Sequence, residues 1–397
     1  MENGKDNLQN SKSRLDRIQG SLVGGAIGDA LGFPVEFMSR SAIVGKYGRH
    51  GITSYELSPI SARALISDDT QMTLFTANGI LKGKTECILH GSSQESSCDW
   101  ISRAYQDWLT TQSSLFPAGK NIKRNSGGAG ISWLLNVPEL YSLRAPGNTC
   151  ISALKELHRN PNTAQPINDS KGCGGIMRVA PVGLFQWQMP LEEIDRKAAE
   201  AAAITHGHPL GYLPAAVLAH ILYCIVYPEH PGKTLLEIVI EAKAAVNELY
   251  RGNYYLNELN QIIDLAIQLS ENRHTDLENI SRIGEGWVAK ETLGIALYCS
   301  LRYEHDFSGG AIAAVNHSGD SDSTGAVTGN ILGAIQGYEG IDKKWKTDLE
   351  LLPVLLEMSQ DLYRGSRLTR ESLLIDWRWM QKYLDIHWEQ KSDSYEK

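Results

Sequence analysis

GDSDSTGAVTGNILGAIQG, residues 319–337, is the stretch that decides the fold of this chain. Two carboxylates and several hydroxyls come just ahead of a run with glycine at every fourth position, at Gly325, Gly329, Gly333 and Gly337. Glycine inside a helix costs about 1 kcal/mol relative to alanine, so this spacing indicates that another segment must approach the helix closely. The stretch therefore predicts an oxygen-rich loop followed by a tightly packed helix.

A second glycine stripe lies near the N-terminus. GSLVGGAIGDALG, residues 20–32, places Gly20, Gly24, Gly28 and Gly32 at the same spacing, which lines them along one helix face. We expect the two stripes to belong to two buried helices that pack against each other at the centre of the fold. Loops at the ends of such helices would be held rigidly, as an active site requires.

Composition limits the classes of protein to consider. The 397 residues are 42% hydrophobic and 21% charged, which is typical of a globular protein with a sizeable core. With 38 basic and 46 acidic residues the net charge is −8, which does not favour nonspecific binding of nucleic acid. The six cysteines form no CxxC pair, so we expect reduced thiols that are packed or incidental.

No targeting segment is predicted. The first residues are polar and mixed in charge, and the longest apolar run, residues 215–227, is short and contains His220. The sequence therefore predicts a cytoplasmic location and no membrane partner.

The apolar pattern predicts a single all-α domain over residues 14–390, preceded by a disordered tail, residues 1–13. Residues 52–57 could form a short strand, and polar patches at 84–97, 112–130, 160–176 and 271–285 are expected to be loops. Helices are expected at 14–31, 69–82, 97–111, 150–158, 191–205, 211–227, 233–250, 254–270, 286–302, 308–316, 324–337, 348–363 and 369–388.

Two acidic loops carry the chemistry. Ser67-Asp68-Asp69-Thr70 precedes an apolar helix, and taken alone it is best interpreted as a helix N-cap, since these side chains accept hydrogen bonds from orphan backbone N–H groups. Residues 320–324, Asp-Ser-Asp-Ser-Thr, repeat the pattern, yet one helix start needs only one capping oxygen. Four carboxylates brought together resist burial unless a cation compensates them, so the pair of loops predicts a divalent-metal site.

The types of ligand narrow the choice of metal. Carboxylate and hydroxyl oxygens suit Mg²⁺ or Mn²⁺, and two loops offer enough oxygens for two ions. Zinc is disfavoured at these loops because they contain no thiolate and the chain has no HExxH motif. His206 and His208 could ligate a metal, but packing or substrate contact is the simpler interpretation.

Glycine-rich segments form the third element. Lys171–Arg178, KGCGGIMR, has a backbone that could approach a phosphate or ribose, although it matches neither the P-loop nor the dinucleotide fingerprint. Taken alone, the segment is better explained as a plain turn. The same alternatives apply to residues 125–128 and 144–148.

These motifs together resemble the ADP-ribosylglycohydrolase family. The matching stretches are GSLVGGAIGDALGFPVEF, ISDDTQMTLF, RAPGNT, KGCGGIMRVAPVGL, ITHGHP and AVNHSGDSDSTGAVTGNILGAIQG, in that order between residues 18 and 340. The resemblance implies an all-α fold with a cleft that holds two Mg²⁺ or Mn²⁺ ions. The ligands that it implies are Ser67, Asp68 and Asp69 in one group and Asp320, Asp322 and Ser323 in the other, with Glu36 beside the metals.

The resemblance also implies the reaction. The sequence of residues 320–324 is more similar to that of the arginine-specific hydrolases than to that of the serine-specific ones, so the favoured substrate is a protein that carries ADP-ribosylarginine. We hypothesise that the ions orient the ribose hydroxyls and an attacking water while Glu36 or Asp69 manages the proton. Expected contacts to the rest of ADP-ribose are Gly127, Gly174, Gly175 and Asn148 at the pyrophosphate, Tyr212 at the adenine, unless it simply packs, and His206 at a ribose or phosphate.

Two alternatives remain open. The chain could hydrolyse another ADP-ribose linkage or a free nucleotide derivative, which the identity of the product would reveal. It could instead be an immunity-type protein that blocks an ADP-ribosyltransferase by contact, with residues 1–13 reaching into the partner.

Overall fold

The computed structural model describes residues 3–91, 97–117, 130–160, 166, 168–229 and 232–387, with side chains from residue 14 onward. Across these residues the regular structure is helical and no strand is present, in agreement with the expected all-α class. The short strand expected at residues 52–57 is wrong, because Leu57 forms only an isolated bridge with Ala64.

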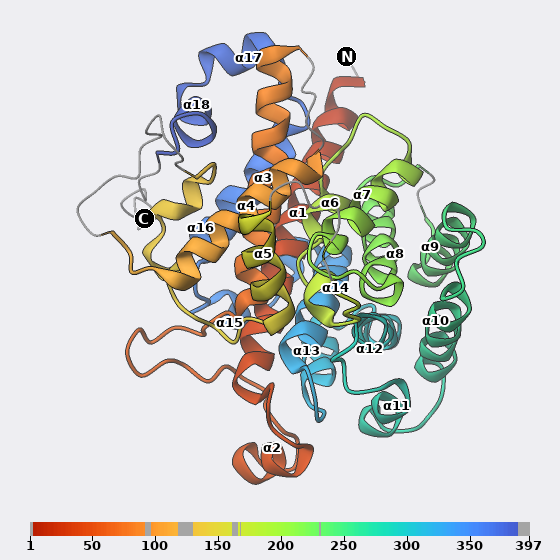
Figure 1. The fold of residues 1–397 in the computed structure, drawn as a ribbon. Helices are drawn as coiled ribbons and strands as arrows, with labels where there is room; N and C mark the ends of the chain where they lie inside the picture. Colours follow the sequence, from red (N-terminus) through yellow and green to blue (C-terminus); the bar gives the residue numbers. More distant parts are fainter. Residues whose placement is uncertain are drawn as a thin grey trace.

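Residues 16–32 of helix α1 (Asn3–Gly32) pack along α14 (Ser321–Gly340) at the centre of the molecule (Figure 1). A Cβ added to Gly20, Gly24 or Gly28 would come within 3.0 Å of the backbone at Gly333, Gly329 or Gly325, respectively. The partners run in opposite order, so the helices are antiparallel and the C-terminal end of α1 lies beside the N-terminal end of α14. The expected pairing of the glycine stripes is confirmed.

Helix α8 (Pro209–Val226) is the apolar helix of the interior. It packs against α7 (Leu191–Ala203), α12 (Ala289–Arg302) and α14. Its length and apolar composition would suffice to cross a membrane, yet 78% of it is buried inside the protein. Such burial is what a core helix shows.

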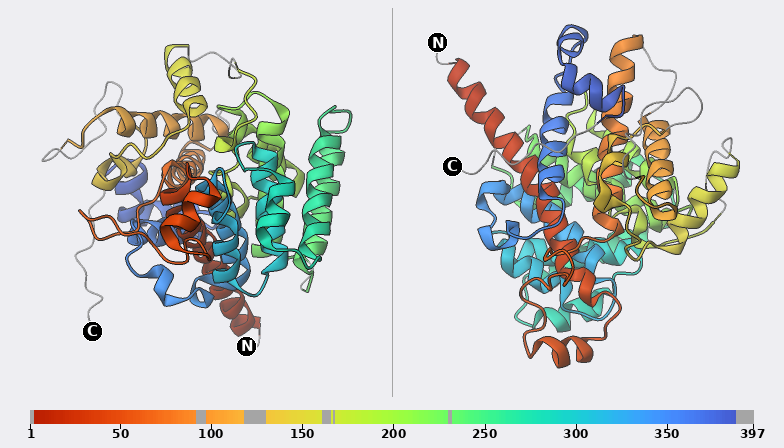
Figure 2. Two further views of the ribbon diagram at one scale, coloured as in Figure 1. Left: turned by 90° about the horizontal axis from the view of Figure 1, so that it is seen from below. Right: turned by 90° about the vertical axis from the view of Figure 1, so that its left-hand side faces the viewer.

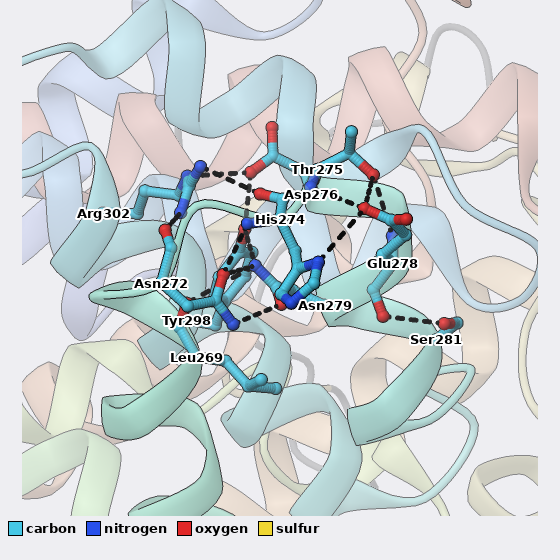
Figure 3. A network of polar contacts seen from close by, with 10 residues as sticks. All are labelled: Leu269, Asn272, His274, Thr275, Asp276, Glu278, Asn279, Ser281, Tyr298 and Arg302. Atoms are coloured by element: carbon cyan, nitrogen blue, oxygen red, sulfur yellow. Dashed lines mark hydrogen bonds and ion pairs between the residues drawn. The ribbon is translucent and has the colours of Figure 1, made fainter.

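Helices α9 (Leu235–Leu249) and α10 (Leu256–Ser270) run side by side at one edge of the molecule (Figures 1 and 2). The loop expected at residues 271–285 instead contains α11 (Asp276–Ile283), which a capping box between Thr275 and Glu278 starts. Figure 3 shows the polar network that fixes this helix, in which Asp276 accepts a hydrogen bond from Tyr298 and pairs with Arg302. This helix is only eight residues long, which is shorter than the window over which an apolar period can be recognised, and this is why the sequence pattern missed it.

Most other expected helices are present with shifted ends. Helix α1 begins ahead of residue 14, while the side chains of residues 1–13 lie outside the description, so the disordered tail stays a prediction. The expected helix at 369–388 is two helices, because Asp376 caps a new start by accepting a hydrogen bond from the backbone N–H of Trp379. The remaining elements are η1 (Phe33–Val35), α2 (Arg40–Tyr47), α3 (Asp68–His90), α4 (Ser97–Ser113), η2 (Trp133–Asn136), η3 (Pro138–Leu140), α5 (Asn148–Arg159), η4 (Cys173–Gly175), α6 (Ala180–Leu184), α13 (Phe307–Val315), α15 (Lys343–Lys346), α16 (Leu352–Gly365), α17 (Arg370–Ile375) and α18 (Trp377–Tyr383).

Candidate active site

The N-terminal ends of α3 and α14 converge. Ser67 caps α3 by accepting a hydrogen bond from the backbone N–H of Asp69 at 3.2 Å, and Asp320 caps α14 by accepting one from the backbone N–H of Ser323 at 3.2 Å. The N-cap interpretation is therefore right for both loops. The loops also meet, since the Ser67 side chain hydrogen-bonds to Asp322.

Six carboxylates are buried around this meeting point. Burial is the largest cause that raises the pKa of each one, and the charge of Asp322 is the next cause for five of them. The pKa of Glu36 is raised to about 10 and that of Asp29 to about 7. The six, none more than 7% exposed, are Asp29, Glu36, Asp68, Asp69, Asp320 and Asp322.

Nothing basic within the described part of the chain forms an ion pair with any of these six carboxylates. Two of their oxygens, Oε2 of Glu36 and Oδ2 of Asp69, are buried without a hydrogen-bond partner. Buried carboxylates of one sign need compensating charge, and oxygen-only ligands suit a hard divalent cation. The residues present therefore fit a Mg²⁺ or Mn²⁺ site.

Glu36 reaches the cluster through a tight turn. Helix α1 ends at Gly32, and the 3₁₀ turn η1, with Pro34 near its start, carries the chain to Glu36. Since α1 and α14 are antiparallel, this turn comes out next to Asp320 and Asp322. The packing of the glycine stripes thus positions Glu36 against the second acidic loop.

Asp29 is a site residue that the sequence reasoning missed. Its Oδ1 accepts a hydrogen bond from the backbone N–H of Ser67 at 2.9 Å, and its Oδ2 accepts from the backbone N–H and the hydroxyl of Thr70 at 3.1 and 2.5 Å. Asp29 thereby ties α1 to the start of α3 and orients the first acidic loop. The available signal was an acidic residue inside the first glycine stripe, directly after Gly28.

The glycine-rich segment lies beside the second acidic loop. The thiol of Cys173 donates a hydrogen bond to Oδ2 of Asp320 at 2.6 Å, and the backbone N–H of Cys173 donates to the carbonyl oxygen of Trp287 at 3.2 Å. The Trp287 ring stacks on Phe37 with centroids 5.8 Å apart, and these side chains are 38% and 75% exposed. An exposed aromatic pair therefore stands next to residues that touch the acidic cluster.

Three of the expected substrate contacts lie near the cluster. Asn148 is exposed at the first turn of α5 and follows Gly147, whose backbone N–H donates to the carboxylate of Asp68. Gly174 and Gly175 belong to η4, where added Cβ atoms would meet the interior of the protein. Their positions are consistent with the expected pyrophosphate contacts, which stay predictions.

The remaining expected contacts differ in their surroundings. His206 is 1% exposed, lies against Gly172 and Gly174, and has a pKa lowered to about 3 by burial and by Arg178, so its ring is neutral. The His206 ring packs against the buried side of the glycine-rich loop. A contact between His206 and the substrate stays a prediction. Tyr212 is half-buried against the core, and its role at adenine likewise stays a prediction. Gly127 lies outside the described residues.

Comparison with known proteins settles the family. The model of the family described as ADP-ribosylglycohydrolase matches residues 10–372. The chain belongs to the ADP-ribosylglycohydrolase family. Members of this family hydrolyse glycosidic linkages of ADP-ribose, so the chain is identified as a hydrolase of that class.

Relatives span most of the chain at low identity. The ADP-ribosyl-[dinitrogen reductase] glycohydrolase of Rhodospirillum rubrum is 23% identical over 341 residues, which cover 85% of this chain and 91% of that protein. The ADP-ribosylarginine hydrolase Tri1 of Serratia proteamaculans is 24% identical over 360 residues, 88% of this chain and 79% of that protein. A solved ADP-ribosylglycohydrolase-related protein complex shares the fold with a TM-score of 0.60 and 22% identity, over 89% of this chain and 99% of that one.

Proposed function

We propose that this protein is a divalent-cation-dependent hydrolase that removes ADP-ribose from modified arginine side chains of proteins. The observation that carries the proposal is the cluster of six buried carboxylates at two converging helix N-termini, with no basic partner in the described structure. The arginine linkage is supported by the sequence of residues 320–324 and by the similarity to the Serratia relative, which is named as an ADP-ribosylarginine hydrolase.

The cluster offers two groups of oxygen ligands. Bound cations would supply the positive charge that the carboxylates lack and would orient and acidify oxygen ligands. Asp29 holds the first group in place through its hydrogen bonds to Ser67 and Thr70, and Cys173 holds Asp320 through its thiol. The two groups that we assign to a pair of Mg²⁺ or Mn²⁺ ions are Ser67, Asp68 and Asp69, and Asp320, Asp322 and Ser323.

The reaction breaks the bond between the anomeric carbon of the ribose and a guanidino nitrogen. Positive charge develops on the sugar as this bond lengthens, and the negative field of the cluster stabilises it. Glu36 and Asp69 each have a buried oxygen without a hydrogen-bond partner, so either can accept the proton of the attacking water. The guanidinium takes up the electron pair of the broken bond and leaves as a neutral guanidine, a strong base that then accepts the proton taken from the water, so the need for a separate acid is reduced.

The rest of ADP-ribose extends over neighbouring backbone. The segment from Gly172 to Gly175 and the start of α5 at Asn148 both border the acidic cluster. Backbone N–H groups of glycine-rich turns and of helix starts bind phosphate oxygens well. We assign the pyrophosphate to this side of the site.

The test is release of ADP-ribose from arginine-, serine- and cysteine-linked protein substrates, with Mg²⁺ and Mn²⁺ compared. We expect the arginine linkage to be cleaved fastest, and we expect Asp68→Asn and Asp322→Asn to lose at least about 100-fold in kcat/KM. Asp264→Asn on the surface of α10 is the matched control and should behave as the wild type.

Three kinds of outcome would contradict the proposal. Wild-type turnover in both folded cluster variants would remove the role of the carboxylates. Preference for another linkage, or release of AMP in place of ADP-ribose, would change the substrate. The blocking mechanism would be favoured instead if a variant without both acidic loops still protected against a transferase, while a variant without residues 1–13 did not.

A further inference from the structure

A second group of metal-binding side chains lies away from the acidic cluster. His220 and Cys224 stand one turn apart on α8, and Glu241 faces them from α9. One potential ligand atom from each of the three comes within 4.8 Å of the other two. Residues four apart share a helix face, so α8 presents the imidazole and the thiol together toward its neighbour.

The histidine is already oriented as a metal ligand would be. Its Nδ1 hydrogen-bonds to Oδ2 of Asp195 on α7 at 2.8 Å, while its Nε2 is buried and the Cys224 side chain is the second polar partner of the ring. The side chain of His220 is 3% exposed, so bulk water does not replace Cys224 and Glu241 as the polar neighbours of this nitrogen. A metal-bound histidine usually donates its other ring N–H to a carboxylate, because this hydrogen bond fixes the orientation of the ring and raises the basicity of the metal-binding nitrogen.

The third ligand, Glu241, and a cavity through which an ion can reach the site are also present. Cys224 and Glu241 line a cavity of about 210 Å³ between α1, α8 and α9. Oε2 of Glu241 pairs with Lys233 at 2.6 Å, which leaves its second oxygen for another partner. The cavity supplies a path for an ion and room for a water as fourth ligand.

We propose that His220, Cys224 and Glu241 bind a zinc ion that links α8 to α9, with Asp195 as the positioning residue. A thiolate, an imidazole and a carboxylate form a ligand set that zinc prefers and magnesium does not. The site is therefore chemically distinct from the oxygen-only cluster. Binding displaces the thiol proton of Cys224 and the proton on Nε2 of His220 to solvent, and no electrons are transferred.

Cobalt(II) titration of the full chain, freed of metals by chelation, tests the proposal. We expect one equivalent of Co²⁺ to produce a thiolate-to-cobalt charge-transfer band and the absorption of a tetrahedral ion, and one equivalent of Zn²⁺ to abolish both. Cys224→Ser should lose the charge-transfer band, and Asp195→Asn should weaken zinc binding by about 10- to 100-fold. Cys173→Ser is the matched control, because Cys173 is the thiol that touches the acidic cluster.

The controls separate this site from the proposed hydrolase site. A band that persists in Cys173→Ser and disappears in Cys224→Ser assigns the cobalt to the α8–α9 site, whether or not the protein cleaves ADP-ribose. A band that persists in Cys224→Ser, or the absence of stoichiometric binding by a wild type that remains folded, would overturn the proposal. Circular dichroism of each variant verifies the fold.

Discussion

Gly28 and Gly325 pack backbone against backbone, so that a Cβ added to either residue would lie within 3.0 Å of the other's carbonyl oxygen. This reciprocal contact sits one helical turn from the acidic cluster, since Gly32 meets Ser321 at the next position of the stripe. The glycine contacts therefore set the distance between α1 and α14 close to the point where the carboxylates of Glu36 and Asp322 meet.

Gly28→Ala should destabilise the protein by about 1–3 kcal/mol or more, because the methyl group cannot be accommodated without separating α1 from α14. Gly45→Ala is the matched control: Gly45 is exposed within α2, and an added Cβ there meets nothing within 4 Å. There alanine should be neutral or stabilising by up to about 1 kcal/mol. Urea unfolding of the two variants measures the contrast, and equal stabilities would contradict the role of the stripe.

Asp29→Asn should weaken Mn²⁺ binding and activity by about 10- to 100-fold. The amide places an NH₂ group against the N–H and hydroxyl donors of Ser67 and Thr70, so the first acidic loop loses its anchor. Asp16→Asn, which removes a carboxylate near the middle of α1 that accepts a hydrogen bond from the backbone N–H of Glu339, far along the helix from the acidic cluster, serves as the control. Activity that recovers at high Mn²⁺ concentration would show positioning, whereas an Asp29 variant with wild-type Mn²⁺ affinity would exclude it.

Removal of divalent cations should lower the melting temperature, because the six buried carboxylates then repel one another without compensation. Adding back Mg²⁺ at about 100 times its dissociation constant should restore about 2.7 kcal/mol of stability. The double variant Asp68→Asn, Asp322→Asn should respond much less, which calorimetry with Mg²⁺ alone can show. A melting temperature that ignores both chelation and Mg²⁺ would count against a cation site.

Asp107 should make stability depend on pH. Burial raises the pKa of Asp107 to about 6, although its Oδ2 accepts hydrogen bonds from the backbone N–H groups of Ile131 and Ser132. The folded protein then holds a proton that the unfolded chain releases near its ordinary pKa of about 4, so the unfolding free energy falls as pH rises from about 4 to 6.

Asp107→Asn keeps both hydrogen bonds through its carbonyl oxygen but removes the titration. Relative to the wild type, the variant should gain up to about 3 kcal/mol between pH 4 and pH 7. Denaturant unfolding of both proteins over this range provides the measurement. A constant difference between them would show that the carboxylate titrates near its ordinary pKa.

Trp287→Ala should raise KM for an arginine-linked substrate about 2- to 30-fold with a smaller change in kcat. The exposed Phe37–Trp287 pair stands beside the cluster, and an aromatic face attracts a guanidinium by about 0.5–2 kcal/mol. Trp377→Ala removes an exposed tryptophan from α18 and should leave KM unchanged. An equal rise in KM for a serine-linked substrate, which has no guanidinium, would sink this assignment.

The local patterns predicted the helices well and their ends less well. Apolar period and capping residues are properties of adjacent positions, so the two glycine helices and both N-caps could be located from the chain alone. Helix α11 was missed because it is only eight residues long, and the contacts that hold it come from the distant Tyr298, whose hydroxyl accepts a hydrogen bond from Asn279 and donates one to Asp276.

The sequence by itself determined which side chains could compensate a hard cation and that two helices must lie backbone to backbone. Only the tertiary structure decided that the two acidic loops meet, that Asp29 anchors one of them, and that His206 packs against the buried side of the glycine-rich loop. It also brought Cys224, which the sequence marked as incidental, to Glu241 of another helix. The physical reason is that the type of a side chain decides which ions it can bind, and the type can be read from the sequence. Burial and the compensation of charge depend instead on which helices lie next to one another, and the close packing of α1 and α14 decides this.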